Sequence, residues 1–181
     1  VRYMHTLKIS IFILALAGHI MTADKSLAMS DEAFWSLVAS SQQSSKRNQQ
    51  TQAQALNKVL STLSEKELTG FYAQYQQYMN SAYHWDLWAA AYIINGGCSD
   101  DCFIDFRNWL IAQGETVYTN ALHDPETLVN IAIPYATGFE AFGYVVHDVF
   151  EKKFGKEIPY NAKYSAITIQ GEAWDETAVY N

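Results

Sequence analysis

The sequence predicts a single compact all-α domain. Apolar residues recur at helical spacing, not strand spacing, over most of the chain after the first 28 residues. Residues that favour helix N-termini precede most of these runs, and the 181 residues include only three prolines. The length fits one domain with one hydrophobic core. We therefore expect about six helices followed by an irregular C-terminal tail.

Residues 1–28 have the composition of a signal peptide. A basic start is followed by the uncharged run 9–18, and small residues stand at the −3 and −1 positions of a cleavage site after Ala28. The apolar run is about ten residues long, whereas a membrane-spanning helix needs about 20. We predict cleavage, export to the periplasm, and a mature helical domain over 29–181. The alternative is a translation start at Met29, which would leave the protein in the cytoplasm.

Capping residues and apolar spacing predict three helices in the first half of the chain. Ser30 can cap the first helix, and acids follow it in the first turn, where the helix dipole favours them. A second helix is expected to begin near Asn48, after a polar stretch. Ser64 and Glu67 have the spacing of a capping box, which predicts the start of a third helix.

Caps and stop signals also order the second half. Glycine accepts the left-handed conformation that a helix C-terminus requires, and proline suits the first helical position. The expected elements are a helix over 83–94 that Gly96 stops, a helix that Ser99 opens and Gly114 ends, a short helix that starts at Asp124 and Pro125, and a helix over 139–154 that Gly155 ends.

The stretch 83–114 is the most distinctive part of the chain. It reads YHWDLWAAAYIINGGCSDDCFIDFRNWLIAQG and combines three tryptophans, four acids, both cysteines and a Gly-Gly turn. This block resembles the signature of a bacterial domain-of-unknown-function family, the one numbered 4240. The resemblance extends from about Asp31 to the segment GEAWDE at 171–176. It implies a helical domain but brings no established chemistry.

The two cysteines are four residues apart at the start of a predicted helix. The family resembled usually has glycine where Cys102 stands, and a second cysteine near Cys98 makes sense in a compartment where disulfides form. A bond requires their Cα atoms to come within about 7 Å. The alternatives are two free thiols or a zinc site. Zinc has less support, because C-x3-C lacks a second pair at ligand spacing.

The charge of the chain is acidic and unevenly placed. The net charge is −7, and from Asp86 to Glu151 ten acids face a single basic residue, Arg107. Such a surface repels nucleic acid and anionic lipid, and suits a cationic partner; simple solubility is the alternative. We expect a partner-binding surface that includes some of five acids: Asp100, Asp101, Asp105, Glu115 and Asp124.

Arg107 is expected to pair with a carboxylate. Asp86, Asp105 or Asp148 could be its partner. The motif of the resembled family keeps WD and FR together, which implies a structural clamp between Asp86 and Arg107; a substrate-binding role is the alternative. His84 and the pair Asp100 and Asp101 should lie at opposite ends of a simple helical hairpin, which argues against a compact metal site. The aspartates are otherwise explained as acids that stabilise a first helical turn.

The absence of a known catalytic motif favours a binding function. No P-loop, G-x-S-x-G, H-E-x-x-H or dinucleotide fingerprint occurs. We expect an immunity-type protein that inhibits a basic secreted toxin, with no cofactor, as a monomer or a homodimer. The alternatives are a metal-dependent hydrolase using Asp100 and Asp101, and a helical interaction module with an unrelated ligand. Dimerisation through the tyrosine-rich tail is also considered, at Tyr160, Tyr164 and Tyr180.

Overall fold

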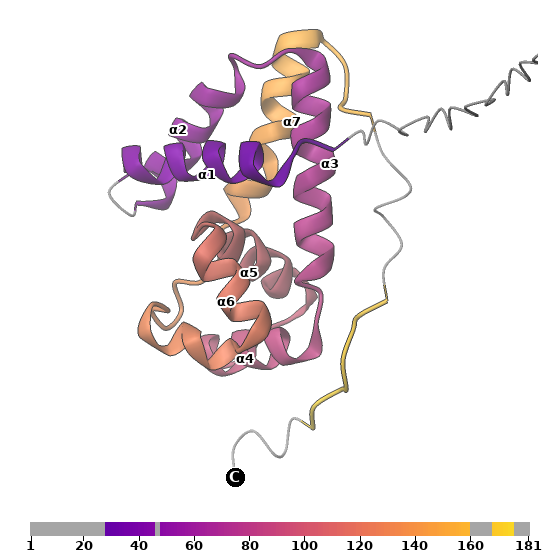
Figure 1. The fold of residues 1–181 in the computed structure, drawn as a ribbon. Helices are drawn as coiled ribbons and strands as arrows, with labels where there is room; N and C mark the ends of the chain where they lie inside the picture. Colours follow the sequence, from indigo (N-terminus) through magenta and orange to yellow (C-terminus); the bar gives the residue numbers. More distant parts are fainter. Residues whose placement is uncertain (1–27, 46–47, 160–167, 176–181) are drawn as a thin grey trace, which may run out of the picture.

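The computed structural model describes residues 28–45, 48–159 and 168–175 (Figure 1). Within these residues the fold is all-helical, as predicted, and forms one domain around one core. The expected leader and the tyrosines of the tail lie outside the described residues, apart from Ala28. The helices in chain order are α1 (Asp31–Ser45), α2 (Gln49–Leu60), α3 (Glu65–Ser81), α4 (Trp85–Asn95), α5 (Asp100–Ala112), α6 (Glu115–His123), the 3-10 helix η1 (Pro125–Asn130) and α7 (Glu140–Phe154).

The predicted caps account for most of the helix boundaries. Ser64 caps α3 and forms the full capping box with Glu67, and the Ser99 side chain accepts a hydrogen bond from the Cys102 N–H at the start of α5. Gly96 ends α4 in the left-handed region, at φ 66°. The prediction that Gly114 ends a helix was incomplete. It follows α5, but it also directly precedes α6, a helix that no side-chain cap announces.

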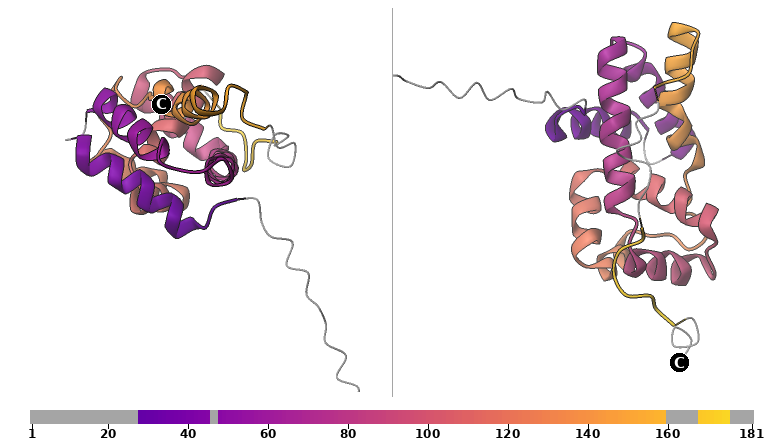
Figure 2. Two further views of the ribbon diagram at one scale, coloured as in Figure 1. Left: turned by 90° about the horizontal axis from the view of Figure 1, so that it is seen from above. Right: turned by 90° about the vertical axis from the view of Figure 1, so that its right-hand side faces the viewer.

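The long helix α3 organises the arrangement. Helix α7 runs antiparallel beside its N-terminal half, while α4, α5 and α6 surround its C-terminal half (Figures 1 and 2). An ion pair of 2.8 Å between Lys156 and Glu65 joins the end of α7 to the start of α3. Helices α1 and α2 pack on each other, and α2 also packs on α7. The described residues include no helix with the length and apolar composition needed to span a membrane.

Aromatic side chains form two connected groups in the core. One group is centred on Phe34, which stacks on Phe71 with 4.8 Å between ring centroids and touches Trp35 edge-on. The other is a series of neighbouring rings, with centroids 4.9 to 6.1 Å apart, along α4 and α5: Trp85, Trp88, Phe103, Phe106 and Trp109. Burying a large aromatic side chain contributes about 1.5–3 kcal/mol. These rings therefore fix how α4 and α5 lie against the core.

Part of the tail is tied to the start of α4. Gln170 forms an isolated parallel bridge with His84, through backbone hydrogen bonds to Tyr83 and Trp85 of 3.0 and 2.9 Å. Gly171 lies so close to the His84 ring that a Cβ atom there would collide with it. The Trp174 ring packs edge-on against Tyr92. The described tail segment, residues 168–175, is irregular, as expected, but it is held in place.

Candidate functional site

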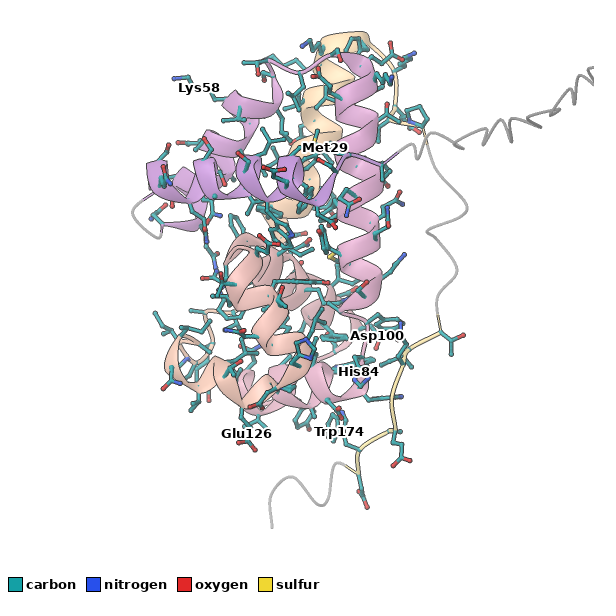
Figure 3. All side chains as sticks on the ribbon, viewed as in Figure 1. Met29, Lys58, His84, Asp100, Glu126 and Trp174 are labelled. Carbon is teal, nitrogen blue, oxygen red and sulfur yellow. A yellow bond between two sulfur atoms is a disulfide. The ribbon has the colours of Figure 1, made fainter. Side chains whose placement is uncertain are left out.

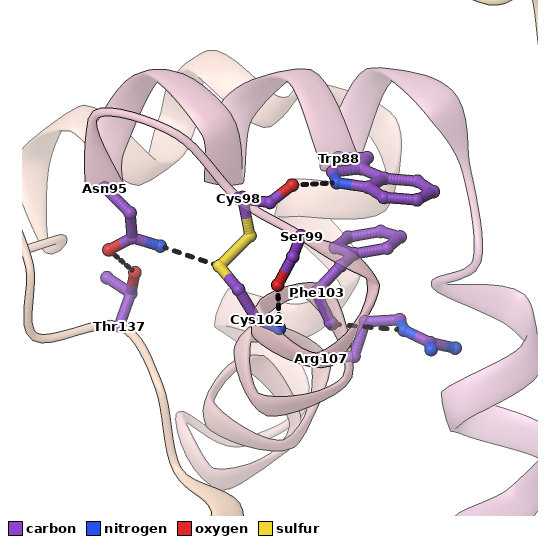
Figure 4. The surroundings of a disulfide bond; sticks show 8 residues. All are labelled: Trp88, Asn95, Cys98, Ser99, Cys102, Phe103, Arg107 and Thr137. Atoms are coloured by element: carbon purple, nitrogen blue, oxygen red, sulfur yellow. Dashed lines mark hydrogen bonds between the residues drawn. A yellow bond between two sulfur atoms is a disulfide. The ribbon is translucent and has the colours of Figure 1, made fainter.

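A disulfide joins Cys98 and Cys102 at the turn between α4 and α5 (Figure 4). Their Cα atoms are 5.2 Å apart, within the range that a disulfide requires. Beside the bond, the Trp88 indole Nε1 donates to the Cys98 carbonyl oxygen at 2.9 Å, and the Asn95 amide lies 3.8 Å from the Cys102 sulfur. The disulfide therefore links the first turn of α5 covalently to the segment that follows α4.

The hydrogen bond from Trp88 reverses an expectation about the acids. Because it holds Cys98, ten residues further along the chain, against Trp88 of α4, the first turn of α5 lies beside the first half of α4. His84 and Asp100 accordingly lie at the same end of the helix pair, not at opposite ends (Figure 3). His84 caps α4 by accepting from the Asp86 N–H at 3.3 Å. The described residues nevertheless contain no group of three or more histidine, cysteine, aspartate or glutamate side chains that could hold a metal ion.

Arg107 has other partners than the expected carboxylate. Its Nη1 donates to the Met79 carbonyl at 2.8 Å and its Nε to the Phe103 carbonyl at 3.3 Å, while the guanidinium lies 4.7 Å from the centre of the Tyr83 ring. The Asp86 carboxylate is instead exposed, 3.6 Å from the His84 imidazole. The predicted Asp86–Arg107 clamp is therefore wrong. Met79 belongs to the last turn of α3, where carbonyls lack helical partners, and Arg107 satisfies one of them.

Arg107 also lines a cleft of about 540 Å³ between α3, α5 and α7. Its side chain is buried, at 9% exposure, and burial lowers the pKa of the guanidinium from its ordinary value. Two hydrogen bonds use two of the five guanidinium N–H donors. The lining residues are Tyr72, Tyr75, Gln76, Met79 and Asn80 from α3, Asp101, Ile104, Asp105, Arg107 and Asn108 from α5, and Glu140, Gly143, Tyr144 and His147 from α7.

Three carboxylates line this cleft. Asp101 and Asp105 are one turn apart on α5, and the Asp105 carbonyl accepts a 3.0 Å hydrogen bond from Phe139 N–H, which brings Glu140 to the same place. The pKa of the Asp105 carboxyl is raised, first by burial and then by the charges of Glu140 and Asp101. Within the described parts of the chain, no side chain forms an ion pair with any of the three. The cleft thus concentrates negative charge above a buried cation.

The wall of the cleft next to Arg107 is polar and closely packed. The Tyr75 hydroxyl donates to the buried Asn108 amide oxygen at 2.6 Å, and burial raises the pKa of this tyrosine. A Cβ atom at Gly143 would come within 2.8 Å of the Asn108 amide nitrogen, so glycine allows α7 to approach this pair. The Gln76 side-chain oxygen is buried and has no hydrogen-bond partner among the described residues. The wall therefore offers one unused acceptor.

The five acids predicted to bind a partner do not form one set. Asp101 and Asp105 line the cleft, whereas Asp100 is exposed and absent from its lining. Asp124 caps η1 by accepting from the Glu126 N–H at 3.0 Å. Glu115 lines a second hollow, of about 650 Å³, with residues of α1 and the α5–α6 junction: Asp31, Glu32, Trp35, Ser36, Ala39, Gln42, Gln113, Gly114 and Thr116.

Several cleft residues were not predicted from the sequence. The residues Glu140, Tyr144, Gln76 and His147 were not among the predicted site residues. His147 is half-buried against the Tyr72 ring, with centroids 4.8 Å apart, and burial lowers its pKa. One signal exists: each helix presents cleft residues at i, i+4 and i+7. These are 72, 76 and 79 on α3, 101, 105 and 108 on α5, and 140, 144 and 147 on α7.

The arrangement is suited to holding a charged ligand. It combines three carboxylates, one guanidinium and tyrosine rings on three rigid helices, within the size range of small-molecule sites. It has no assembled nucleophile and base among the described residues that would indicate hydrolysis.

The comparisons with known proteins identify a family. A protein-family model described as "Protein of unknown function (DUF4240)" matches residues 29–152, which include α1 to α6, η1 and most of α7. The match contains the whole cleft and ends before the tail segment that contacts His84. No curated protein and no solved structure matches the chain. The chain therefore belongs to the DUF4240 family.

Proposed function

We propose that this protein is an exported acidic binding protein that inhibits a basic protein partner through the cleft between α3, α5 and α7. One observation carries the proposal: Asp101, Asp105 and Glu140 lie together without a cation from the described residues to neutralise them. An unpaired charge costs stability where it is partly buried, as it is at Asp105, so its presence in the cleft is better explained by binding. A cationic side chain of a partner would supply the missing charge.

The partner class that fits best is a basic secreted toxin, such as a cell-wall hydrolase. Acidic side chains steer a basic active-site surface into contact and accelerate association. The placement of the acids on two helices, α5 and α7, limits the ordering cost of binding. The Tyr144 side chain, 57% exposed beside the acids, offers an aromatic face to an incoming cation. An immunity-type role follows from these features.

Export is part of the proposal and is supported by the disulfide. Bonds of this kind persist in oxidising compartments and are rare in the cytosol. Mass measurement of the protein recovered from periplasm would test both points. We expect a chain that begins after Ala28 and gains two hydrogens on reduction. Recovery of the reduced chain from cytoplasm alone would contradict export.

The interface can be tested with two variants of equal charge change. The cleft variant carries Asp101→Asn, Asp105→Asn and Glu140→Gln. The control variant instead changes three exposed acids outside the cleft, with Glu32→Gln, Glu115→Gln and Glu151→Gln. Both raise the net charge by the same amount and keep side-chain shape. A difference between them therefore reports position, not net charge.

The readout is capture of a partner from the cell envelope at low salt, followed by kinetics with the purified partner. We expect the cleft variant to slow association by about tenfold or more and to weaken its salt dependence, and the control to stay close to wild type. For a toxin, only wild type and the control should protect cells that express it. Equal binding by the cleft variant would exclude the cleft as the interface.

A further inference from the structure

The base of the cleft holds a charge of the opposite sign to its rim. Arg107 is buried there, and none of the carboxylates in the described parts of the chain forms an ion pair with it. Its compensation comes from neutral groups, namely two carbonyl oxygens and the rings of Tyr83 and Phe103. A buried guanidinium retains a strong preference for a carboxylate that can accept two N–H donors side by side.

Ligands with one charge satisfy only part of this cleft. A simple cation would be attracted by Asp101, Asp105 and Glu140, but Arg107 would repel it from the base. A simple anion suits Arg107, yet it must pass three carboxylates. A ligand that carries both charges, with its carboxylate inward and its cation outward, satisfies both parts. Since the acids outnumber the arginine, a ligand with net positive charge fits best.

We infer that the cleft binds a basic amino acid that has a free carboxylate. The carboxylate lies on Arg107, and the cationic side chain lies among Asp101, Asp105 and Glu140. This inference rests on the proposed function, because it names what enters the same cleft. The buried Gln76 oxygen, which has no partner among the described residues, can accept from an N–H of the ligand. Tyr72 and Tyr144 can cover the methylene groups.

The same chemistry has two sources, a free basic amino acid or the last residue of a polypeptide. A volume of about 540 Å³ accommodates either a single residue or a short chain end. The source decides whether the site binds a free metabolite or the C-terminus of a protein. Calorimetry on the purified protein separates the two with lysine and the peptide Gly-Gly-Lys.

Matched ligands test each charge without changing the protein. Gly-Gly-Lys amide lacks the carboxylate, and Gly-Gly-norleucine lacks the side-chain cation. We expect each to bind at least about tenfold more weakly than Gly-Gly-Lys, since each loses a charge-assisted contact. Binding of the free-acid peptide alone would assign the site to a chain end, and binding of lysine alone would assign it to a free amino acid.

Two protein variants assign the contacts. In Arg107→Met the free acid and the amide should bind equally. In the triple cleft variant, with Asp101→Asn, Asp105→Asn and Glu140→Gln, the lysine and norleucine peptides should bind equally. The same triple variant outside the cleft is the control and should keep wild-type preferences. The ligand series on wild type remains decisive if Arg107→Met fails to fold.

The inference is overturned if neither lysine nor Gly-Gly-Lys binds at millimolar concentration, or if the amide binds as well as the acid. These outcomes do not affect the proposed function, which fails separately. A cleft variant that captures and inhibits the partner like wild type would remove the proposed function. A protein that binds its partner through the cleft but ignores every peptide would remove only this inference.

Discussion

The cleft and the second hollow both carry acids, but the acids have different surroundings. In the second hollow, the Asp31 carboxylate accepts hydrogen bonds of 2.6 Å from the Gln74 amide and the Tyr78 hydroxyl, which join α1 to α3. In the cleft, no donor or cation of the described residues bonds the side chains of Asp101, Asp105 or Glu140. The two hollows are similar in size, so what distinguishes them is the hydrogen bonding of the Asp31 carboxylate.

This difference separates acids that hold the fold from acids available for binding. A hydrogen-bonded carboxylate between two helices is expected to stabilise, because its removal leaves donors unsatisfied. A carboxylate that is partly buried beside two others is expected to destabilise, and function is the usual reason to keep such groups. Stability measurements on single substitutions can therefore check the assignment without knowledge of the partner.

The largest expected effect comes from the base of the cleft. Arg107→Met keeps an unbranched apolar stem but removes the guanidinium. We expect the free energy of unfolding to fall by about 3 kcal/mol, because the buried Met79 carbonyl loses its partner and the cation–ring contacts are lost. Urea denaturation followed by circular dichroism measures this quantity.

The control for this substitution is Arg107→Lys, which keeps the positive charge. One ammonium cannot reach two carbonyls in the geometry of a guanidinium, so about half of the loss should remain. If Arg107→Met were as stable as wild type, the arginine would have no structural role. Its burial would then have to be explained by ligand binding alone.

Local features of the fold followed from the sequence because their causes lie within a few residues. The capping box of Ser64 and Glu67 involves atoms three residues apart, and the same is true of the Ser99 cap. The left-handed end of α4 at Gly96 depends on one backbone angle. A disulfide between Cys98 and Cys102 could be expected for the same reason, because the two cysteines are only four residues apart. Each of these features can be derived without knowing the rest of the fold.

Long-range features did not follow, because several partners were chemically acceptable. Asp86 was an acceptable partner for Arg107 because of its charge. The hydrogen bond is instead accepted by the Met79 carbonyl, 28 residues away at the C-terminal end of α3. The change of chain direction after Gly96 depends on the hydrogen bond that Trp88 donates to the Cys98 carbonyl. The stripes of α3, α5 and α7 were visible as periodic polar and aromatic residues. Their meeting at one cleft depends on how the helices pack.

A smaller effect is expected in the second hollow. Asp31→Ala should lower the free energy of unfolding by about 1.5 kcal/mol, because the Gln74 and Tyr78 donors lose their acceptor. Asp31→Asn keeps one oxygen and should lose about half as much. A loss equal for alanine and asparagine would show that the charge, and not the hydrogen bonds, is responsible.

Tyr78 gives this substitution a second readout. Burial, followed by the hydrogen bond to Asp31, raises the pKa of Tyr78 to about 12, above its ordinary value of 10.0. The folded state therefore keeps the proton longer than the unfolded chain, and this stabilisation is complete below pH 10.0 and lost as pH rises through about 12. Asp31→Ala should lower the pKa of Tyr78. Ultraviolet titration of the folded protein measures the change.

The smallest expected effect has the opposite sign and lies in the cleft. The pKa of Asp105 is raised in the folded protein, so its ionised form is disfavoured there relative to the unfolded chain. The contribution of the wild-type carboxyl is fully present below its ordinary value of 3.8 and is lost as pH rises through the folded value. Asp105→Asn should therefore stabilise the protein at neutral pH. We expect a gain of about 0.5 kcal/mol or less, because the group is only partly buried and solvent screens it.

The background of Glu140→Gln gives this small effect a control. Glu140 is the largest charge contribution to the shift of Asp105, so Asp105→Asn should gain less when Glu140 is already neutral. Urea denaturation at neutral pH and below pH 3.8 would measure all four members of the cycle. If Asp105→Asn instead lowered the free energy of unfolding at neutral pH, Asp105 would be a structural acid like Asp31. The distinction between the two hollows would then fail, because an acid that holds the fold cannot be removed to test binding.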